Sequence, residues 1–167
     1  SKAMNQLLND TLWEDLDYLI IDLPPGTGDI HITIAQQFPL VGAVVVTTPQ
    51  ALSVTDAHKA IAMFVSPQIH VPVLGIIENF SYFAPPDQPD RKYHLFGQGG
   101  GQKLSDTFGI PLLGKLPLIE SVGQSSDSGM PSALDAGSIA AKAFAELAAR
   151  VAQQVSIVNA QSQTVPV

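Results

Sequence analysis

The sequence predicts an α/β fold with a mostly parallel sheet and flanking helices. Three observations carry this prediction. Four short apolar runs are each closed by a turn signal, the first three are continuous rather than alternating, and helix patterns lie between them. Continuous apolar strands are typical of a sheet that is covered on both faces. The alternation of helix and strand indicates βαβ crossovers. The predicted strands are 18–23, 41–48, 73–78 and 112–118.

Three helices are predicted from apolar residues that recur every three or four positions. A first stripe precedes strand 18–23 and starts almost at residue 1, with no cap. A second follows Ser53 and Asp56, which form a capping signature of the S-x-x-D type. A third predicts a helix over 138–152. The stripe residues are Met4, Leu7, Leu8 and Leu12, then Ala57, Ala60, Ile61, Phe64 and Val65, then Ile139, Ala143, Leu147 and Val151.

Size and composition favour a single domain and exclude several functions. The chain has 167 residues, of which 46% are hydrophobic and 14% are charged, enough for a sizeable core. Eight basic and fifteen acidic residues give a net charge of −7, which disfavours nucleic acid and anionic membranes as primary partners. The chain contains no cysteine, so it cannot by itself make a disulfide, a thiol nucleophile or a cysteine-ligated metal site. We expect a cytoplasmic protein without a membrane span.

Two stretches interrupt the alternation. Residues 83–101 form a long loop that is rich in proline at its start and in glycine at its end, and loops of this length are usually functional or disordered. The C-terminal residues are polar. We therefore divide the chain into a partial domain over 1–155 and a flexible tail over 156–167. The uncapped helix at the start predicts that this domain is cut from a larger protein.

The sharpest motif follows the first predicted strand. Residues 19–29 read L-I-I-D-L-P-P-G-T-G-D, which places Asp22 at the carboxyl edge of a parallel sheet, where open α/β folds bind ligands. A carboxylate there commonly holds a Mg²⁺-bound water beside nucleotide phosphates, and Gly26 lets the backbone approach a phosphate closely. The alternative is a proline–glycine turn in which Asp22 is a turn former. In both cases Asp29 is expected to be the N-cap of the next helix.

Six motifs in chain order resemble one family. D-x-P-P-G-T-x-D at 22–29 is similar to the Walker B/switch II segment of the Mrp-type ATP-binding iron–sulfur cluster carriers, which are MinD-like P-loop proteins. The likeness continues with V-T-T-P-Q at 46–50, G-I-I-E-N-F-S-Y-F at 75–83, F-G-x-G-G-G at 96–101, L-G-x-L-P-L at 113–118 and D-S-G-x-P at 127–131. It covers about residues 4–134.

The resemblance implies a Rossmann-like three-layer P-loop NTPase fold and a site for ATP and magnesium. Asp22 would be the Walker B aspartate, which acts on Mg²⁺ through water and is the candidate catalytic residue, and Gly26 the switch glycine at the γ-phosphate. Asn79 would read the adenine edge, with Pro117 and Leu118 as walls of the base pocket. The expected partners are a second copy of the chain, as a homodimer or another form of self-association, and the iron–sulfur recipient proteins that the family implies. Apart from this resemblance, the local sequence favours the interpretation of Asn79 as a turn residue that ends its strand.

The chain departs from the family by lacking a phosphate loop. No stretch fits G-K-G-G-x-G-K-[ST], whose N–H groups and lysines cradle phosphates. The glycine-rich residues 97–101 do not follow a strand directly, and Lys103 precedes Leu104 rather than Ser or Thr. We interpret them as a flexible loop that enters a helix over 102–108. The phosphate loop is expected upstream of Ser1, so this chain alone should neither bind ATP tightly nor hydrolyse it.

The second departure concerns the cluster. Many members carry C-x-x-C just after S-Y-F, but residues 84–94 here contain three prolines and no cysteine. An iron–sulfur cluster held by this chain is therefore doubtful. Asp87, Asp90 and His94 could bind a harder cation, although a solvated loop is the simpler interpretation. The remaining histidines have no metal-ligand spacing.

Three functions remain open from the sequence. The first is the C-terminal part of an Mrp-type ATP-dependent iron–sulfur cluster carrier. The second is a MinD-like or ParA-like nucleotide switch that handles no cluster. The third is a non-catalytic α/β interaction module, the literal interpretation of a chain without a phosphate loop.

Overall fold

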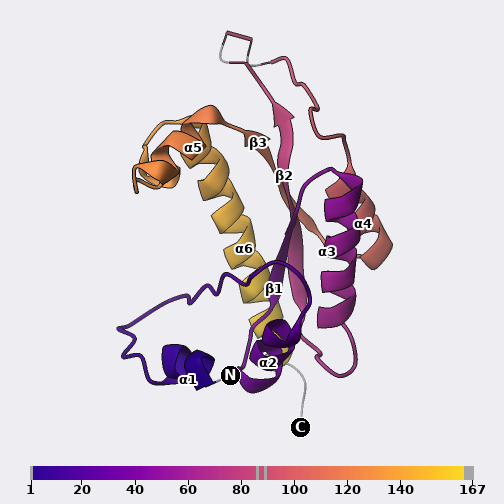
Figure 1. The fold of residues 1–167 in the computed structure, drawn as a ribbon, viewed down its shortest axis with the longest axis vertical. Coiled ribbons are helices and arrows are strands. Elements are labelled where there is room, and N and C mark those ends of the chain that lie inside the picture. Colours follow the sequence, from indigo (N-terminus) through magenta and orange to yellow (C-terminus); the bar gives the residue numbers. More distant parts are fainter. Residues whose placement is uncertain (1, 86, 89, 164–167) are drawn as a thin grey trace.

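The computed structural model describes residues 2–85, 87–88 and 90–163, and it contains a parallel sheet between helices (Figure 1). The elements in chain order are α1 (Lys2–Asn9), α2 (Asp29–Gln37), β1 (Ala43–Thr47), α3 (Ala51–Phe64), β2 (Val73–Phe83), α4 (Gly100–Phe108), β3 (Leu112–Leu118), α5 (Glu120–Asp127), the 3₁₀ turn η1 (Ser132–Leu134) and α6 (Ile139–Gln163).

The sheet has the strand order β1-β2-β3, and both pairs are parallel. In the register, Val45 lies beside Ile76 and Thr47 beside Glu78, while Ile77 lies beside Gly114. β2 is the central strand, and its residues 74–78 are all buried. This burial on both faces is the reason that the run carries no polar alternation. The predicted α/β fold class is confirmed.

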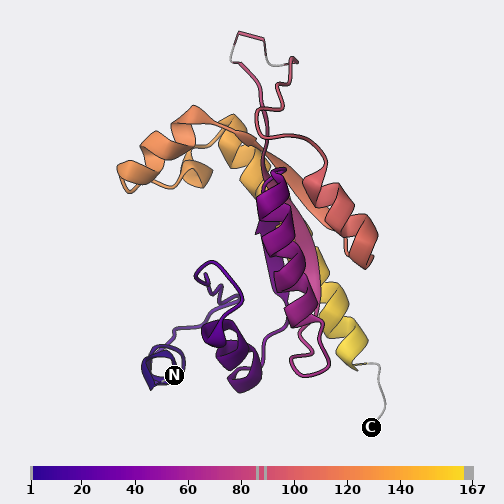
Figure 2. The same cartoon turned by 45° about the vertical axis from the view of Figure 1, so that its right-hand side comes forward.

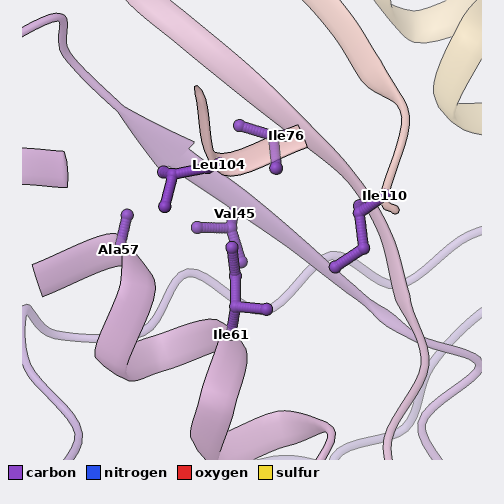
Figure 3. Packing of buried hydrophobic residues seen from close by; sticks show 6 residues of the cluster. All are labelled: Val45, Ala57, Ile61, Ile76, Leu104 and Ile110. Atoms are coloured by element: carbon purple, nitrogen blue, oxygen red, sulfur yellow. The ribbon is translucent and has the colours of Figure 1, made fainter. Parts of the chain in front are cut away.

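The helices form a layer on each face of the sheet. α3 and α4 contact each other and cover one face, while α6 packs against β2 and β3 on the other (Figures 1 and 2). The main core lies under α3 and α4, where side chains of both helices meet the inner sheet face (Figure 3). Its members are Val45, Ala57, Ile61, Ile76, Leu104 and Ile110. Ala57 and Ile61 are four residues apart, so the predicted stripe of α3 is the stripe that is buried.

α6 is tied to the opposite face by a polar contact as well as by packing. Arg150 donates from Nη1 to the carbonyl oxygen of Leu113 at 2.7 Å. Ala140 is buried near the start of the helix, where a small side chain allows close approach. α6 continues to Gln163, so residues 156–163 of the expected tail are helical, and residues 164–167 lie outside the described part of the chain.

The first predicted strand, 18–23, is wrong for this structure. Between α1 and α2 the chain is irregular, and no described residue of 10–28 belongs to a strand. A strand is stabilised by its neighbours rather than by its own sequence, and no strand among the described residues pairs with this segment. Its apolar side chains are consequently exposed, with Ile20 at 86%.

The helix starts also differ from the predictions. α3 begins at Ala51 with Gln50 as N-cap, so Ser53 lies inside the helix and the predicted capping signature is wrong. Asp56 instead pairs with Lys59 at 3.1 Å on the exposed side of the helix. Asp29 is the first residue of α2, and Gly28 is the N-cap. The Asp29 carboxylate still lies in the first turn, where the helix dipole favours it. None of the helices in the described ranges is long and apolar enough to cross a membrane.

Candidate functional site

Asn79 lies in a bulge of the central strand, not at its end. Glu78 lies opposite Lys115, and Tyr82 lies opposite Pro117. Between these two pairs β2 advances four residues, whereas β3 advances only two. β2 then continues to Phe83. The backbone of Phe80 in this bulge has a φ of 53°, in the left-handed region that non-glycine residues seldom adopt. Bulges of this kind re-aim side chains and are frequent beside functional sites.

The Asn79 side chain keeps hydrogen-bonding capacity. Its Oδ1 accepts the N–H of Phe80 at 3.0 Å, a local contact of the kind expected from a turn former. Its NH₂ group makes no hydrogen bond to the residues that the structure describes, and the side chain is half-buried. The amide can therefore both donate and accept toward a ligand.

Pro117 and Leu118 lie on the neighbouring strand, at the same end of the sheet. Pro117 is opposite Tyr82 and Leu118 is opposite Phe83, and both are half-buried. A hollow of about 200 Å³ between β3 and α6 has Pro117, Tyr82 and Arg150 in its wall. The three residues predicted to contact the base thus come from adjacent strands at the carboxyl end of the sheet.

Asp22 and Gly26 lie in the segment between α1 and α2. Both are exposed, and Asp22 makes no hydrogen bond or ion pair with the described residues. Gly26 has a φ of +108°, and a Cβ at this position would have no atom within 4 Å, so a turn rather than a crowded contact requires glycine here. This segment lies next to α2, away from the end of the sheet that holds Asn79, Pro117 and Leu118 (Figures 1 and 2). The structure therefore does not bring the two groups of predicted residues together.

A buried carboxylate that sequence reasoning missed lies next to Asn79. Glu78 is 1% exposed. Its Oε1 accepts a hydrogen bond from the Ser81 hydroxyl at 2.5 Å, and its Oε2 accepts one from the backbone N–H of Gly101 at 2.6 Å. The available signal was an acidic residue inside an apolar strand, followed at a distance by three glycines.

The glycine-rich stretch differs from the expected loop in its last two residues, which belong to α4 and pack closely against their neighbours. α4 begins at Gly100, wedged between α3 and β2. A Cβ on Gly100 would lie 2.6 Å from Val54 Cγ2, and one on Gly101 would lie 3.0 Å from Glu78 Cβ. A side chain would force its neighbours to move at Gly100 and would be tightly crowded at Gly101, because backbone and neighbours approach closely at both positions. The N–H of Gly101 points at a protein carboxylate.

The proline-rich loop is closed at its base. Phe83 and Tyr93 form an isolated antiparallel bridge, and Lys92 lies over the Tyr82 ring with Nζ 4.4 Å from its centroid. His94 places Nδ1 2.9 Å from the carbonyl oxygen of Ser81. Asp87 and Asp90 are exposed, and Pro86 and Pro89 lie outside the described residues. Within the described ranges no three His, Asp or Glu side chains are grouped so that they could hold a metal ion.

The ParA family model, described as NUBPL iron-transfer P-loop NTPase, matches residues 1–152. The chain belongs to this family. The match includes every predicted site residue, and it agrees with the parallel sheet and its flanking helices.

Several relatives in this family are similar over nearly the whole chain. An iron–sulfur cluster carrier protein of Synechocystis is 48% identical over 155 residues, which are 92% of this chain and 43% of that protein. A protein of the same description from Pseudomonas fragi is 45% identical, and the match covers 89% of this chain and 51% of that protein. Another, from Escherichia coli K12, is 46% identical, and the match covers 93% of this chain and 42% of that protein. The chain thus spans about half the length of the curated relatives it matches.

A solved structure supports the same fold. It is a nucleotide-binding protein from Archaeoglobus fulgidus in complex with ADP, 38% identical, with a TM-score of 0.66. The match covers 76% of this chain and 51% of that one. The chain is therefore an α/β member of a nucleotide-binding P-loop NTPase family.

Proposed function

We propose that this chain forms the base-binding part of an Mrp-type, ATP-dependent iron–sulfur cluster carrier of the cytoplasm. The observation that carries this proposal is the family match over residues 1–152, together with cluster carriers that are 45–48% identical over nine-tenths of the chain. ATP with Mg²⁺ is the nucleotide, and the cluster is the cargo that passes to recipient proteins.

The adenine-binding role belongs to the carboxyl end of β2 and β3. The half-buried Asn79 amide, with its NH₂ group unbonded among the described residues, suits the mixed donor and acceptor edge of adenine. Pro117 and Leu118 offer apolar surface on the next strand for the face of the ring. These three residues therefore suit the nucleotide base, and we assign the binding of the phosphates to a different part of the complete protein.

The phosphate-binding role requires a further strand. β1 pairs only with β2 in the described part of the chain, and Val46 on β1 is 59% exposed. The apolar segment 18–23 is likewise without a strand partner there. We propose that a strand carrying the phosphate loop lies between them in the complete protein, pairing with β1 and converting 18–23 into a strand. Asp22 and Gly26 would then reach the carboxyl edge, where Asp22 would hold a Mg²⁺-bound water and the phosphate-loop lysine would neutralise phosphate charge.

The cluster must find its ligands outside this chain. No cysteine is present, and the loop over 84–94 offers oxygen and imidazole groups in place of thiolates. Iron–sulfur clusters are held chiefly by cysteine. We assign the ligands to the remainder of the protein, to a second subunit or to a recipient.

A second candidate is a nucleotide-switch regulator without a cluster. The observation that favours it is the same cysteine-free loop, which is closed by the Phe83–Tyr93 bridge and is suited to docking a protein. A non-catalytic interaction module is the third candidate, and a G-K-G-G-x-G-K-[ST] motif in the complete protein would eliminate it.

One experiment separates these candidates. The complete protein is titrated with Mg-ATP and Mg-GTP, and transfer of a reconstituted cluster to an apo-ferredoxin is followed by absorbance. A carrier prefers ATP, transfers the cluster, and loses most of its base preference in Asn79→Ala. A regulator prefers ATP but transfers nothing. An interaction module binds neither nucleotide, which would overturn the proposal.

A further inference from the structure

The buried carboxylate of Glu78 has no cationic partner among the described residues. Burial of a charge is costly unless hydrogen bonds compensate for the lost water. Here the compensation comes from the Ser81 hydroxyl and from the N–H of Gly101, the second residue of α4. Hydrogen bonds to an ionised acceptor are roughly twice as strong as neutral ones, and the helix N-terminus adds its dipole.

The hydrogen bond between Glu78 and Ser81 closes the bulge that contains Asn79. Glu78 and Ser81 flank the two residues Asn79 and Phe80, so their hydrogen bond spans the bulge from one side to the other. The left-handed backbone of Phe80 is strained for a phenylalanine and persists only where its surroundings hold it. The Glu78–Ser81 bond supplies such a constraint. It therefore fixes the direction in which Asn79 leaves the strand.

The hydrogen bond between Glu78 and Gly101 ties the chain that follows the proline-rich loop to the bulge. Gly101 follows the loop, and its N–H is bonded directly to Glu78. A second contact to the same part of the chain comes from Ser81, whose carbonyl oxygen lies 2.9 Å from His94 Nδ1. The rings of Phe80 and Phe96 also lie 6.0 Å apart, which adds a contact between bulge and loop. Residues 94–101 are thus held against the bulge by three contacts, one of which is made by Glu78 itself.

We propose that Glu78 is a positioning residue that holds Asn79 for base recognition and ties residues 94–99 to the same unit. The part of this inference that concerns base recognition rests on the proposed function. Two polar atoms at the end of one side chain are needed because two partners must be held at once, which the single oxygen of a serine cap on α4 would not achieve. Glutamine keeps both bonds in principle, since its oxygen can accept from Gly101 while its amide donates to the Ser81 oxygen.

The test uses four variants of the complete protein, which are Glu78→Gln, Glu78→Ala, Ser81→Ala and Leu104→Ala. Leu104→Ala is the matched control because it opens a cavity under α4 and removes neither hydrogen-bond partner of Glu78. Affinities for Mg-ATP and Mg-GTP are measured at a temperature where each variant is folded. We expect the ATP:GTP preference to fall about tenfold in Glu78→Ala and Ser81→Ala, which corresponds to about 1.4 kcal/mol. It should stay within about twofold of the unmodified protein in Glu78→Gln and Leu104→Ala.

Amide hydrogen exchange provides a readout that does not depend on nucleotide. In Glu78→Ala, exchange should accelerate in residues 79–83 and 94–99 together, whereas Leu104→Ala should accelerate it in α3 and α4, which share the core with Leu104. If Glu78→Ala does not fold, Ser81→Ala, which removes only one hydroxyl group, still tests the bulge. An unchanged preference in a folded Ser81→Ala protein, or exchange that changes in only one of the two segments, would overturn the inference. A protein that binds no ATP would refute the proposed function, and the exchange result would still decide whether Glu78 ties residues 94–99 to the bulge.

Discussion

Phe83 and Tyr93 exchange both of their backbone hydrogen bonds, each 2.8 Å long. The loop between them therefore leaves β2 and returns beside it at one point. Lys92 and Arg91 fold back over the rings of Tyr82 and Tyr93 at this base. Changes in the outer part of the loop should consequently leave the sheet intact.

Two cysteines in this loop should create the cluster site that the chain lacks. The N–H of Gln88 donates to the carbonyl oxygen of Pro85 at 3.0 Å, so residues 85 and 88 form the two ends of a tight turn. Anaerobic reconstitution of the 167-residue chain with iron and sulfide should give no charge-transfer absorbance. The double variant Pro85→Cys/Gln88→Cys should gain a chelator-sensitive spectrum, shared between two subunits. The single variant Pro85→Cys is the control and should gain none. A stoichiometric cluster in the unmodified chain would contradict our interpretation of the loop.

In the complete protein, Asp22→Asn should impair magnesium-dependent turnover more than nucleotide binding. A carboxylate that acts on a metal through water typically contributes about 10–100-fold, so we expect a loss of that size in kcat. Stability should change by less than about 0.5 kcal/mol, because Asp22 is exposed and unbonded among the described residues. Asp15→Asn, in the same exposed segment, is the control for charge. Turnover that survives in Asp22→Asn would show that Asp22 is only a turn residue.

The isolated chain should self-associate through the open edge of β1. Val46 is exposed on this strand, and an unpaired edge is a template for another strand. Val46→Lys should shift the chain toward a monomer in size-exclusion chromatography with light scattering, since edge lysines oppose pairing. Val65→Lys, at the exposed C-cap of α3, should leave the association unchanged. Only monomers of 17.7 kDa in the unmodified chain would count against this edge as the contact.

The core under α3 should dominate the stability of the chain. Ile61 is 0% exposed within the cluster shared by α3, α4 and the sheet, so Ile61→Ala should lower the free energy of unfolding by about 2–4 kcal/mol. Leu52 lies on the same helix but is 76% exposed, and Leu52→Ala should change it by less than about 0.5 kcal/mol. Urea denaturation at equilibrium measures both values. Equal losses in the two variants would show that the core does not lie where Figure 3 places it.

Periodicity predicted the parts of the fold whose neighbours are within the chain. β3 has the predicted bounds Leu112–Leu118, and Ile61 lies on the predicted buried stripe of α3. The segment 18–23 failed because a strand depends on a partner, which its own sequence does not supply. Asn79 was placed near the carboxyl edge, but the bulge was not predicted, because it depends on a mismatch between β2 and β3. Glu78 was missed because its partner Gly101 is 23 residues away and contributes only backbone.

The winding of the sheet has a consequence for where a nucleotide can bind. The connections through α3 and α4 place both helices on one face, and the strand order follows the chain order without reversal. Open α/β sheets bind ligands in the crevice where two neighbouring connections wind in opposite directions. Among the described strands no such reversal occurs, so we expect the crevice at the open side of β1. A strand that completes the crevice would need a connecting helix on the face that α6 occupies beside β2 and β3.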